Sequence, residues 1–99
     1  MKDVPLQILL STFNGERWLA ELLDSLAQQT YQNWQLLVRD DASSDQTMQV
    51  LLQWQAQYPA KVSGILRDGV NLGSTQSFSR LVAFSQAPYL MFCDQDDVW

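Results

Sequence analysis

Three aspartates follow a short apolar run at the end of the sequence, and their spacing is suited to holding a divalent metal. Tyr89 to Cys93 has the length and residue types of a strand buried on both faces, and Asp94, Asp96 and Asp97 come directly after it. Neighbouring carboxylates oppose each other's ionisation, so such a cluster calls for a positive partner. Oxygen ligands favour Mg²⁺ or Mn²⁺ over zinc. The alternative is an acidic loop that stays solvated.

A second acidic cluster, with Asp40, Asp41 and Asp45, follows the apolar run from Trp34 to Val38. The two clusters hold six of the eleven acids in a chain of net charge −5, so the acidity is local. The six Lys and Arg residues are dispersed and form no basic stripe, which argues against nucleic-acid binding. The absence of histidine excludes a His-based zinc site and a Ser-His-Asp triad within this chain.

Apolar periodicity predicts strands that alternate with helices. A helix is expected from Glu16 to about Gln29, with a buried stripe from Trp18 to Leu26. A second helix is expected to start at a capping box of Ser43 and Gln46 and to end at Pro59, and Ser74 or Thr75 is expected to cap a third. The predicted strands are Leu6 to Leu10, Trp34 to Val38, Val62 to Leu66 and Tyr89 to Cys93.

This alternation predicts an α/β fold with a mostly parallel, Rossmann-like sheet covered by helices on both faces. Ligands bind such sheets outside the carboxyl ends of the strands, where the strand order reverses. The polar segment from Ser11 to Asn14 and the two acidic clusters all fall at that edge. In the order 3-2-1-4, the ends of strands one and four would flank one crevice.

The phosphate-binding loops that rely on glycine are missing. Strand one is followed by Ser11 to Gly15, which has one glycine where a dinucleotide fingerprint needs three, and no Walker A sequence is present. A metal held by the last acids is the natural counter-charge for a diphosphate. Asp41 would then be free to accept a hydrogen bond from the N–H of a pyrimidine, and the Ser11 and Thr12 hydroxyls could hold base or ribose.

Five segments resemble, in order and spacing, the family 2 glycosyltransferases of the GT-A fold. They are Ser11 to Gly15, Leu26 to Thr30, Asp40 to Asp45, Asn71 to Gly73 and Phe92 to Trp99. The last segment is similar to bacterial transferases that build O-antigen, capsule or rhamnose-rich polysaccharides. The resemblance implies a UDP- or dTDP-sugar donor, a saccharide or lipid-linked acceptor, inversion at the sugar carbon, and Mn²⁺ or Mg²⁺ as cofactor.

The resemblance also implies roles for individual residues. Asp41 would contact the pyrimidine, Asp94 would face ribose or metal-bound water, and Asp96 would bind the metal. Phe13 stands where many relatives have tyrosine, so any contact from that hydroxyl is lost. The implied donor-binding residues are Ser11, Thr12, Phe13, Asn14, Asp41, Arg67, Asn71, Gly73 and Asp94, and the implied metal ligands are Asp94, Asp96 and Asp97. Arg39 is expected to be a surface or pairing residue.

In the family, the acceptor-binding half and the general base come after this point in the chain. Residues 1–99 are therefore expected to be one domain, the donor-nucleotide half of an enzyme, truncated after the fourth strand, and no catalytic base is assigned. Two alternatives remain open. One is a non-catalytic nucleotide-binding or assembly module that forms homo-oligomers through its exposed sheet edge. The other is a phosphotransfer domain, which needs acids after strand one rather than Ser11 to Asn14.

Cysteine usage and hydropathy predict a cytoplasmic location. The single Cys93 cannot form an internal disulfide, the N-terminus lacks a signal peptide, and no apolar run approaches the roughly 20 residues of a membrane span. The full-length enzyme is expected to lie in the cytoplasm or at the inner face of the membrane.

Overall fold

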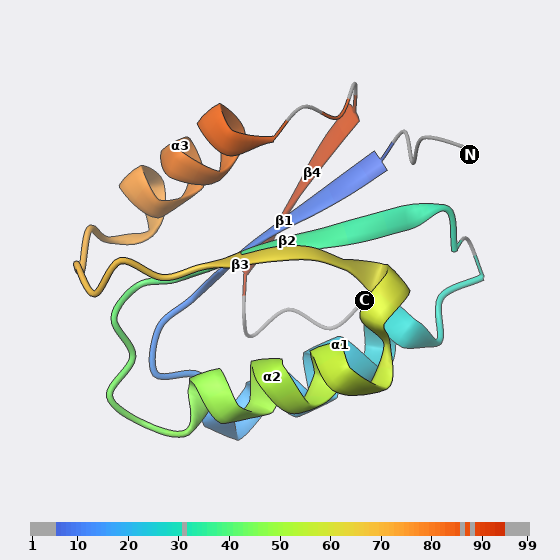
Figure 1. Cartoon of the computed structure of the whole chain (residues 1–99), viewed down its shortest axis with the longest axis horizontal. Helices are drawn as coiled ribbons and strands as arrows, with labels where there is room; N and C mark the ends of the chain where they lie inside the picture. Colours follow the sequence, from blue (N-terminus) through green and yellow to red (C-terminus); the bar gives the residue numbers. More distant parts are fainter. Residues whose placement is uncertain (1–5, 31, 86, 88, 95–99) are drawn as a thin grey trace.

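A four-stranded sheet carries the other elements (Figure 1). Its strands lie in the order β3-β2-β1-β4, and each neighbouring pair is parallel. Their bounds are β1 (Leu6–Thr12), β2 (Trp34–Asp40), β3 (Val62–Leu66) and β4 (Tyr89–Asp94). This computed structural model describes residues 6–30, 32–85, 87 and 89–94. The predicted parallel α/β sheet is confirmed.

The helices form two further layers. Figure 1 shows α1 (Glu16–Ala27) and α2 (Thr47–Gln57) on one face of the sheet and α3 (Ser74–Phe84) on the other. A short 3₁₀ turn, η1 (Pro59–Lys61), joins α2 to β3. The described part of the chain thus has the predicted three-layer arrangement. No helix in it is long and apolar enough to cross a membrane.

The strands separate two hydrophobic cores, because successive side chains point to opposite faces of a sheet. The larger core packs α1 and α2 against alternate residues of the central strands, Ile8, Leu10, Leu36 and Val38. The smaller core lies under α3 and contains Leu9, Leu37 and Leu81. Both faces of β1 and β2 are therefore buried, which explains why these strands read as continuous apolar runs.

Helix α1 buries a leucine stripe against the sheet, as its spacing predicts. Leu19, Leu22, Leu23 and Leu26 are all buried. Trp18 was expected in this stripe, but it is 46% exposed and its ring lies 5.3 Å from the Arg17 guanidinium carbon. Trp18 precedes Leu19 by one residue, a turn of about 100° around the axis, and this places its ring at the edge of the buried face.

The starts of α2 and α3 differ from the predicted caps. No side-chain cap is present at either helix start, and the residues before the helices are Gln46 and Gly73. The Ser43 hydroxyl donates to Asp40 instead, while an Asp45 oxygen accepts the Thr47 amide at 2.9 Å. The competition between local acceptors explains the difference, because serine side chains bond to whichever nearby group the loop presents.

Strand β4 is much more exposed than predicted. Tyr89 to Phe92 are between 38% and 66% exposed, whereas Cys93 is buried. Helix α3 packs on β1 and β2, and α1 and α2 share their core with those strands. Among the described residues, no strand pairs with the outer edge of β4, and the helices leave Tyr89 to Phe92 largely uncovered. The centroid of the Phe92 ring lies 5.3 Å from that of Phe78 on α3.

Candidate functional site

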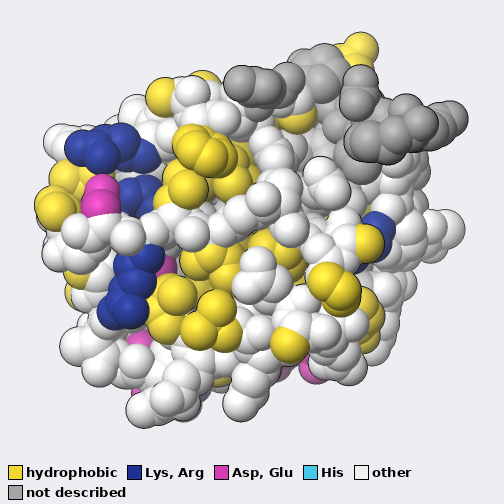
Figure 2. Space-filling view, in the orientation of Figure 1, with side chains coloured by type: hydrophobic (Ala, Val, Ile, Leu, Met, Phe, Trp, Pro, Cys, Tyr) yellow, Lys and Arg dark blue, Asp and Glu magenta, His cyan; other side chains and the backbone are white. Residues whose placement is uncertain are grey.

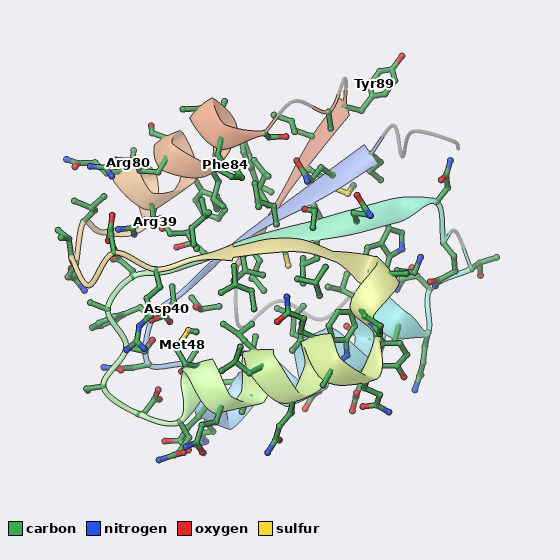
Figure 3. The ribbon with its side chains drawn as sticks, viewed as in Figure 1. Arg39, Asp40, Met48, Arg80, Phe84 and Tyr89 are labelled. Atoms are coloured by element: carbon green, nitrogen blue, oxygen red, sulfur yellow. The ribbon has the colours of Figure 1, made fainter. Side chains whose placement is uncertain are left out.

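The predicted polar segments meet at the carboxyl edge of the sheet. Ser11 pairs in register with Arg39 on one side and with Asp94 on the other, and Thr12 pairs with Asp40. Figure 3 shows Arg39 on the α3 side of the sheet and Asp40 on the side of α2. In the orientation of Figure 1, Figure 2 shows basic side chains gathered where the loops after β2 and β3 lie.

The predicted metal ligands are only partly within the described structure. The backbone of Asp94 ends β4 beside Ser11, at the same edge as Asp40. Asp96 and Asp97 lie outside the described residues. Among the residues that are described, no group of three His, Cys, Asp or Glu side chains could hold a metal ion. The metal-binding roles of Asp94, Asp96 and Asp97 therefore stay predictions.

The Asp41 carboxylate lies in a cradle formed by Arg39 and the loop before α3. Its Oδ1 accepts hydrogen bonds from Arg39 Nη1 at 2.6 Å and from the Leu72 amide at 2.7 Å. Its Oδ2 accepts one from the Gly73 amide at 2.8 Å. The Asn71 side chain donates to the Asp41 carbonyl at 3.1 Å. These contacts bring Asp41 together with two candidate residues of a distant segment, Asn71 and Gly73.

These contacts keep Asp41 ionised. Burial alone raises the pKa of the carboxyl, but hydrogen bonds from the Leu72 amide, from Arg39 and from the Gly73 amide, together with the Arg39 charge, outweigh it. The pKa of Asp41 is therefore lowered below its ordinary value. An ionised carboxylate only accepts hydrogen bonds, so a ligand at this position must supply the donor.

We expect the free energy of unfolding to decrease as the pH falls from about 5 to 2. Because folding lowers the pKa of Asp41, the unfolded chain binds more protons in this range and acid favours it. The contribution is complete above the unfolded pKa of about 3.9 and is lost as the pH falls through the folded value. Asp41→Asn should flatten this dependence, measured by urea unfolding at stepped pH. The exposed Asp24→Asn is the control, and equal slopes in Asp41→Asn and wild type would refute the expectation.

Of the two roles expected for Arg39, surface or pairing, the structure shows pairing: the side chain is buried and forms ion pairs with Asp41 and Asp68. It is 1% exposed, and besides Asp41 its guanidinium bonds Ser77, Asp68 and the Val70 carbonyl at 2.7–3.1 Å. Sequence reasoning allowed for pairing but predicted neither the burial of Arg39 nor its partners. The available signal was an arginine inside an apolar strand and next to two acids, since a buried charge needs several partners.

Asp40 organises the opposite face of the same edge. It is fully buried and accepts hydrogen bonds from the Thr12 hydroxyl at 2.8 Å and from the Ser43 amide and hydroxyl at 2.9 and 2.6 Å. The Thr12 hydroxyl is thus buried and donates to Asp40, and its predicted contact with base or ribose stays a prediction. The Ser11 hydroxyl is likewise bonded to Ser77, at 2.9 Å.

Arg67 is an exposed cation beside Asp40. Its side chain is 47% exposed, with Nε 3.6 Å from Asp40 Oδ2 and Nη2 3.3 Å from the Ser43 carbonyl. The loop that follows it contains Gly69 and Gly73, both with positive φ, at 77° and 84°, which favours glycine. Arg67 therefore retains surface that a phosphate or base could contact.

Asn14 and Phe13 occupy the turn after β1. The Asn14 side-chain oxygen accepts a hydrogen bond from the Ser44 backbone amide at 2.8 Å, and the Asn14 backbone amide donates to the Ser43 hydroxyl at 2.9 Å. Asn14 therefore ties the first loop to the second, with φ at 47°. Phe13 is 44% exposed beside it. The site thus combines a partly exposed aromatic ring with two loops fixed to each other.

The family model and two of the most similar curated proteins all describe glycosyltransferases. The family model described as Glycosyl transferase family 2 matches residues 7–99. The dTDP-rhamnosyl transferase RfbG of Shigella flexneri is 30% identical over 93 residues, 91% of this chain and 32% of that protein. The UDP-Glc:alpha-D-GlcNAc-diphosphoundecaprenol beta-1,3-glucosyltransferase WfgD of Escherichia coli is 28% identical over all 99 residues and 38% of its own length.

A solved structure agrees on the fold. The mannosyltransferase PcManGT from Pyrobaculum calidifontis, in complex with GDP-Man and Mn²⁺, superposes with a TM-score of 0.87 over 96% of this chain and 28% of that one, at 19% identity. The chain spans about a third of the length of the first curated relatives it matches. With the family model matched from Gln7 to the last residue, the chain belongs to glycosyl transferase family 2.

Proposed function

We propose that this chain is the donor-binding part of a glycosyltransferase that moves a sugar from a nucleotide diphosphate to a bacterial surface polysaccharide or a lipid-linked acceptor. The observation that carries the proposal is the Asp41 cradle, which gathers Asp41, Asn71 and Gly73 at the carboxyl edge of a family 2 sheet. Open parallel sheets bind their ligands at this edge. RfbG and WfgD, whose names state a dTDP donor and a UDP-Glc donor, support a nucleotide sugar.

The base is proposed to lie against Asp41. Uracil and thymine present a ring N–H, and the ionised carboxylate accepts it. Phe13, 44% exposed, offers a ring beside the base, and Arg67 lies where it can meet the base or the diphosphate. Ser11 lies next to Arg39 and Asp94 in the sheet, so its place is under the ribose.

A divalent metal fits the donor set of the last segment. Asp94, Asp96 and Asp97 offer only carboxylate oxygens, which suit Mg²⁺ or Mn²⁺, and the backbone of Asp94 lies at the proposed site. The bound metal would neutralise the diphosphate as it leaves. The residues of this chain bind and orient the donor, while the general base that deprotonates the acceptor is assigned to none of them. Inversion and a location at the cytoplasmic face of the membrane are part of the same proposal.

Nucleotide binding should depend on the metal and on Asp96. Titration calorimetry with UDP and with dTDP, each with and without Mn²⁺, is expected to show binding that is strongest with the metal. Asp96→Ala should weaken it at least about tenfold, because a lost charged contact typically contributes 1.5–3 kcal/mol. Asp24→Ala, an exposed acid on α1, is the control. A folded chain that binds neither nucleotide, or binds equally well without Asp96, would overturn the proposal.

An assembly module is the second candidate, and exposed β4 favours it. Met91 and Tyr89 are 43% and 66% exposed on a strand whose outer edge pairs with no other described strand, a surface suited to pairing with a second copy. Light scattering is expected to show concentration-dependent dimers, and Met91→Lys should abolish them. Val70→Lys, at an equally exposed position outside β4, should not. A monomer at every concentration would contradict self-association. β1 carries no acid, so phosphotransfer finds no support.

A further inference from the structure

We propose that Arg39 is a positioning residue for base recognition: its guanidinium holds Asp41 Oδ1 and the loop from Asp68 to Gly73 together, so that Oδ2 keeps one acceptor site for a ring N–H. This inference rests on the proposed function, because it assigns the selection of the base to Arg39. It concerns a residue that touches no ligand and acts through Asp41.

The first support is the distribution of hydrogen bonds on Asp41. A carboxylate has about two acceptor sites on each oxygen. Among the described residues, Oδ1 is occupied twice, by Arg39 and by the Leu72 amide, whereas Oδ2 accepts one hydrogen bond, from the Gly73 amide. One acceptor site therefore remains, and it lies on Oδ2. Without Arg39 a second site would open on Oδ1, and the carboxylate would be free to rotate.

The second support is that Arg39 and Asp41 form hydrogen bonds to the two ends of the same loop, Asp68 to Gly73. Arg39 Nη2 holds Asp68 at 2.7 Å and the Val70 carbonyl at 3.0 Å. Asp41 holds the amides of Leu72 and Gly73. Only 4% of the Asp41 side chain is accessible, so the position of this loop controls how a base approaches the carboxylate.

The third support is the energetic cost of the arrangement. Arg39 is the largest side chain that is fully buried in the described structure, and it lies between two aspartates, Asp41 and Asp68. A buried ion pair contributes little stability beyond what apolar residues of similar volume would supply. The directions of its hydrogen bonds explain the buried ion pair better than stability does. The planar guanidinium of arginine holds several acceptors in fixed directions, whereas lysine presents a compact charge on a flexible stem.

The expected chemical consequence is selectivity between pyrimidines. Uracil carries N–H at ring position 3, while cytosine carries a bare acceptor there that an ionised carboxylate repels. A fixed Oδ2 therefore favours UDP over CDP, and a loosened Asp41 can rotate toward the exocyclic amine of cytosine. Loss of Arg39 should reduce the preference for UDP as well as the affinity for it, whereas general destabilisation would lower both affinities alike.

Two measurements on Arg39→Met, Arg39→Lys and Arg80→Met test this role. Arg80→Met is the matched control, because exposed Arg80 bonds the same Asp68 at 3.3 Å without touching Asp41. Hydrogen exchange of the nucleotide-free chain compares the amides of Leu72 and Gly73 with core amides of α1. Calorimetry with UDP and CDP in Mn²⁺ gives the ratio of their dissociation constants.

In Arg39→Met, exchange at the two loop amides should rise at least about tenfold relative to the core amides, and the UDP preference should fall by a similar factor. Arg39→Lys should restore part of both, and Arg80→Met should change neither. Unchanged loop protection or an unchanged UDP/CDP ratio in a folded Arg39→Met would overturn the proposal. If Arg39→Met does not fold, Arg39→Lys decides by the same criteria. If the wild type binds no nucleotide, the proposed function fails, and the role in base recognition falls with it, while exchange still decides whether Arg39 positions the loop.

Discussion

Asp40→Ala is expected to lower the free energy of unfolding by about 3–5 kcal/mol. The carboxylate is fully buried, and its removal leaves the Ser43 amide, the Ser43 hydroxyl and the Thr12 hydroxyl without their acceptor. Each buried group that loses its partner costs about 1–3 kcal/mol. Arg67 adds little, because it is 47% exposed and 3.6 Å away. A domain of this size is stable by about 5–15 kcal/mol, so the loss is a large part of the total.

Urea unfolding followed by tryptophan fluorescence measures this effect. Asp24→Ala removes an acid from the exposed face of α1 and should change the free energy by less than about 0.5 kcal/mol. Asp40→Asn is expected to fall between wild type and Asp40→Ala, because the amide keeps one oxygen acceptor. A loss below about 1 kcal/mol in Asp40→Ala would show that water replaces the carboxylate and that the network does not hold the loops.

Leu51→Ala should cost about 2–5 kcal/mol, while Leu52→Ala should cost less than about 0.5 kcal/mol. The two leucines are neighbours on α2, with the same helix propensity and the same change of side chain. Leu51 is 2% exposed and belongs to the larger core, whereas Leu52 is 51% exposed. The difference between the two variants therefore isolates burial. Similar losses in urea unfolding would mean that α2 is not packed on the sheet as described.

The fold followed from the sequence because local signals and the general rules for parallel sheets agree. Leu19, Leu22 and Leu26 repeat at helical spacing, and the apolar runs of β1 and β2 are what a strand buried on both faces requires. The right-handed crossover rule then leaves few ways to connect the strands. Two of the wrong predictions concern burial. The burial of Trp18 depends on its angle around the helix axis, and the burial of β4 depends on what covers the edge of the sheet.

The site was predicted less completely, because ion pairing is not visible in spacing. Asp41, Asn71 and Gly73 were each named, but the sequence did not indicate that their loop closes on Asp41. Asp40 accepts hydrogen bonds from Ser43, whereas Asp41 accepts them from the loop before α3. The two side chains have different partners because consecutive residues at a strand end point to opposite sides of the sheet. Arg39 faces the same side as Asp41, and its choice of partners depends on where the loop from Asp68 to Val70 lies.

The central position of β1 has a consequence for how the chain folds. β1 pairs with β2 on one side and with β4 on the other, and Leu6 lies opposite both Trp34 and Tyr89. During synthesis β1 emerges first of the four strands, and β4, the partner for its second edge, emerges after the other three. Contacts between residues so distant in sequence slow folding, because the loop between them must close first. The pairing of β1 with β4 is therefore expected to be the late step, and until then the apolar edge of β1 is open to chaperones or to other nascent chains.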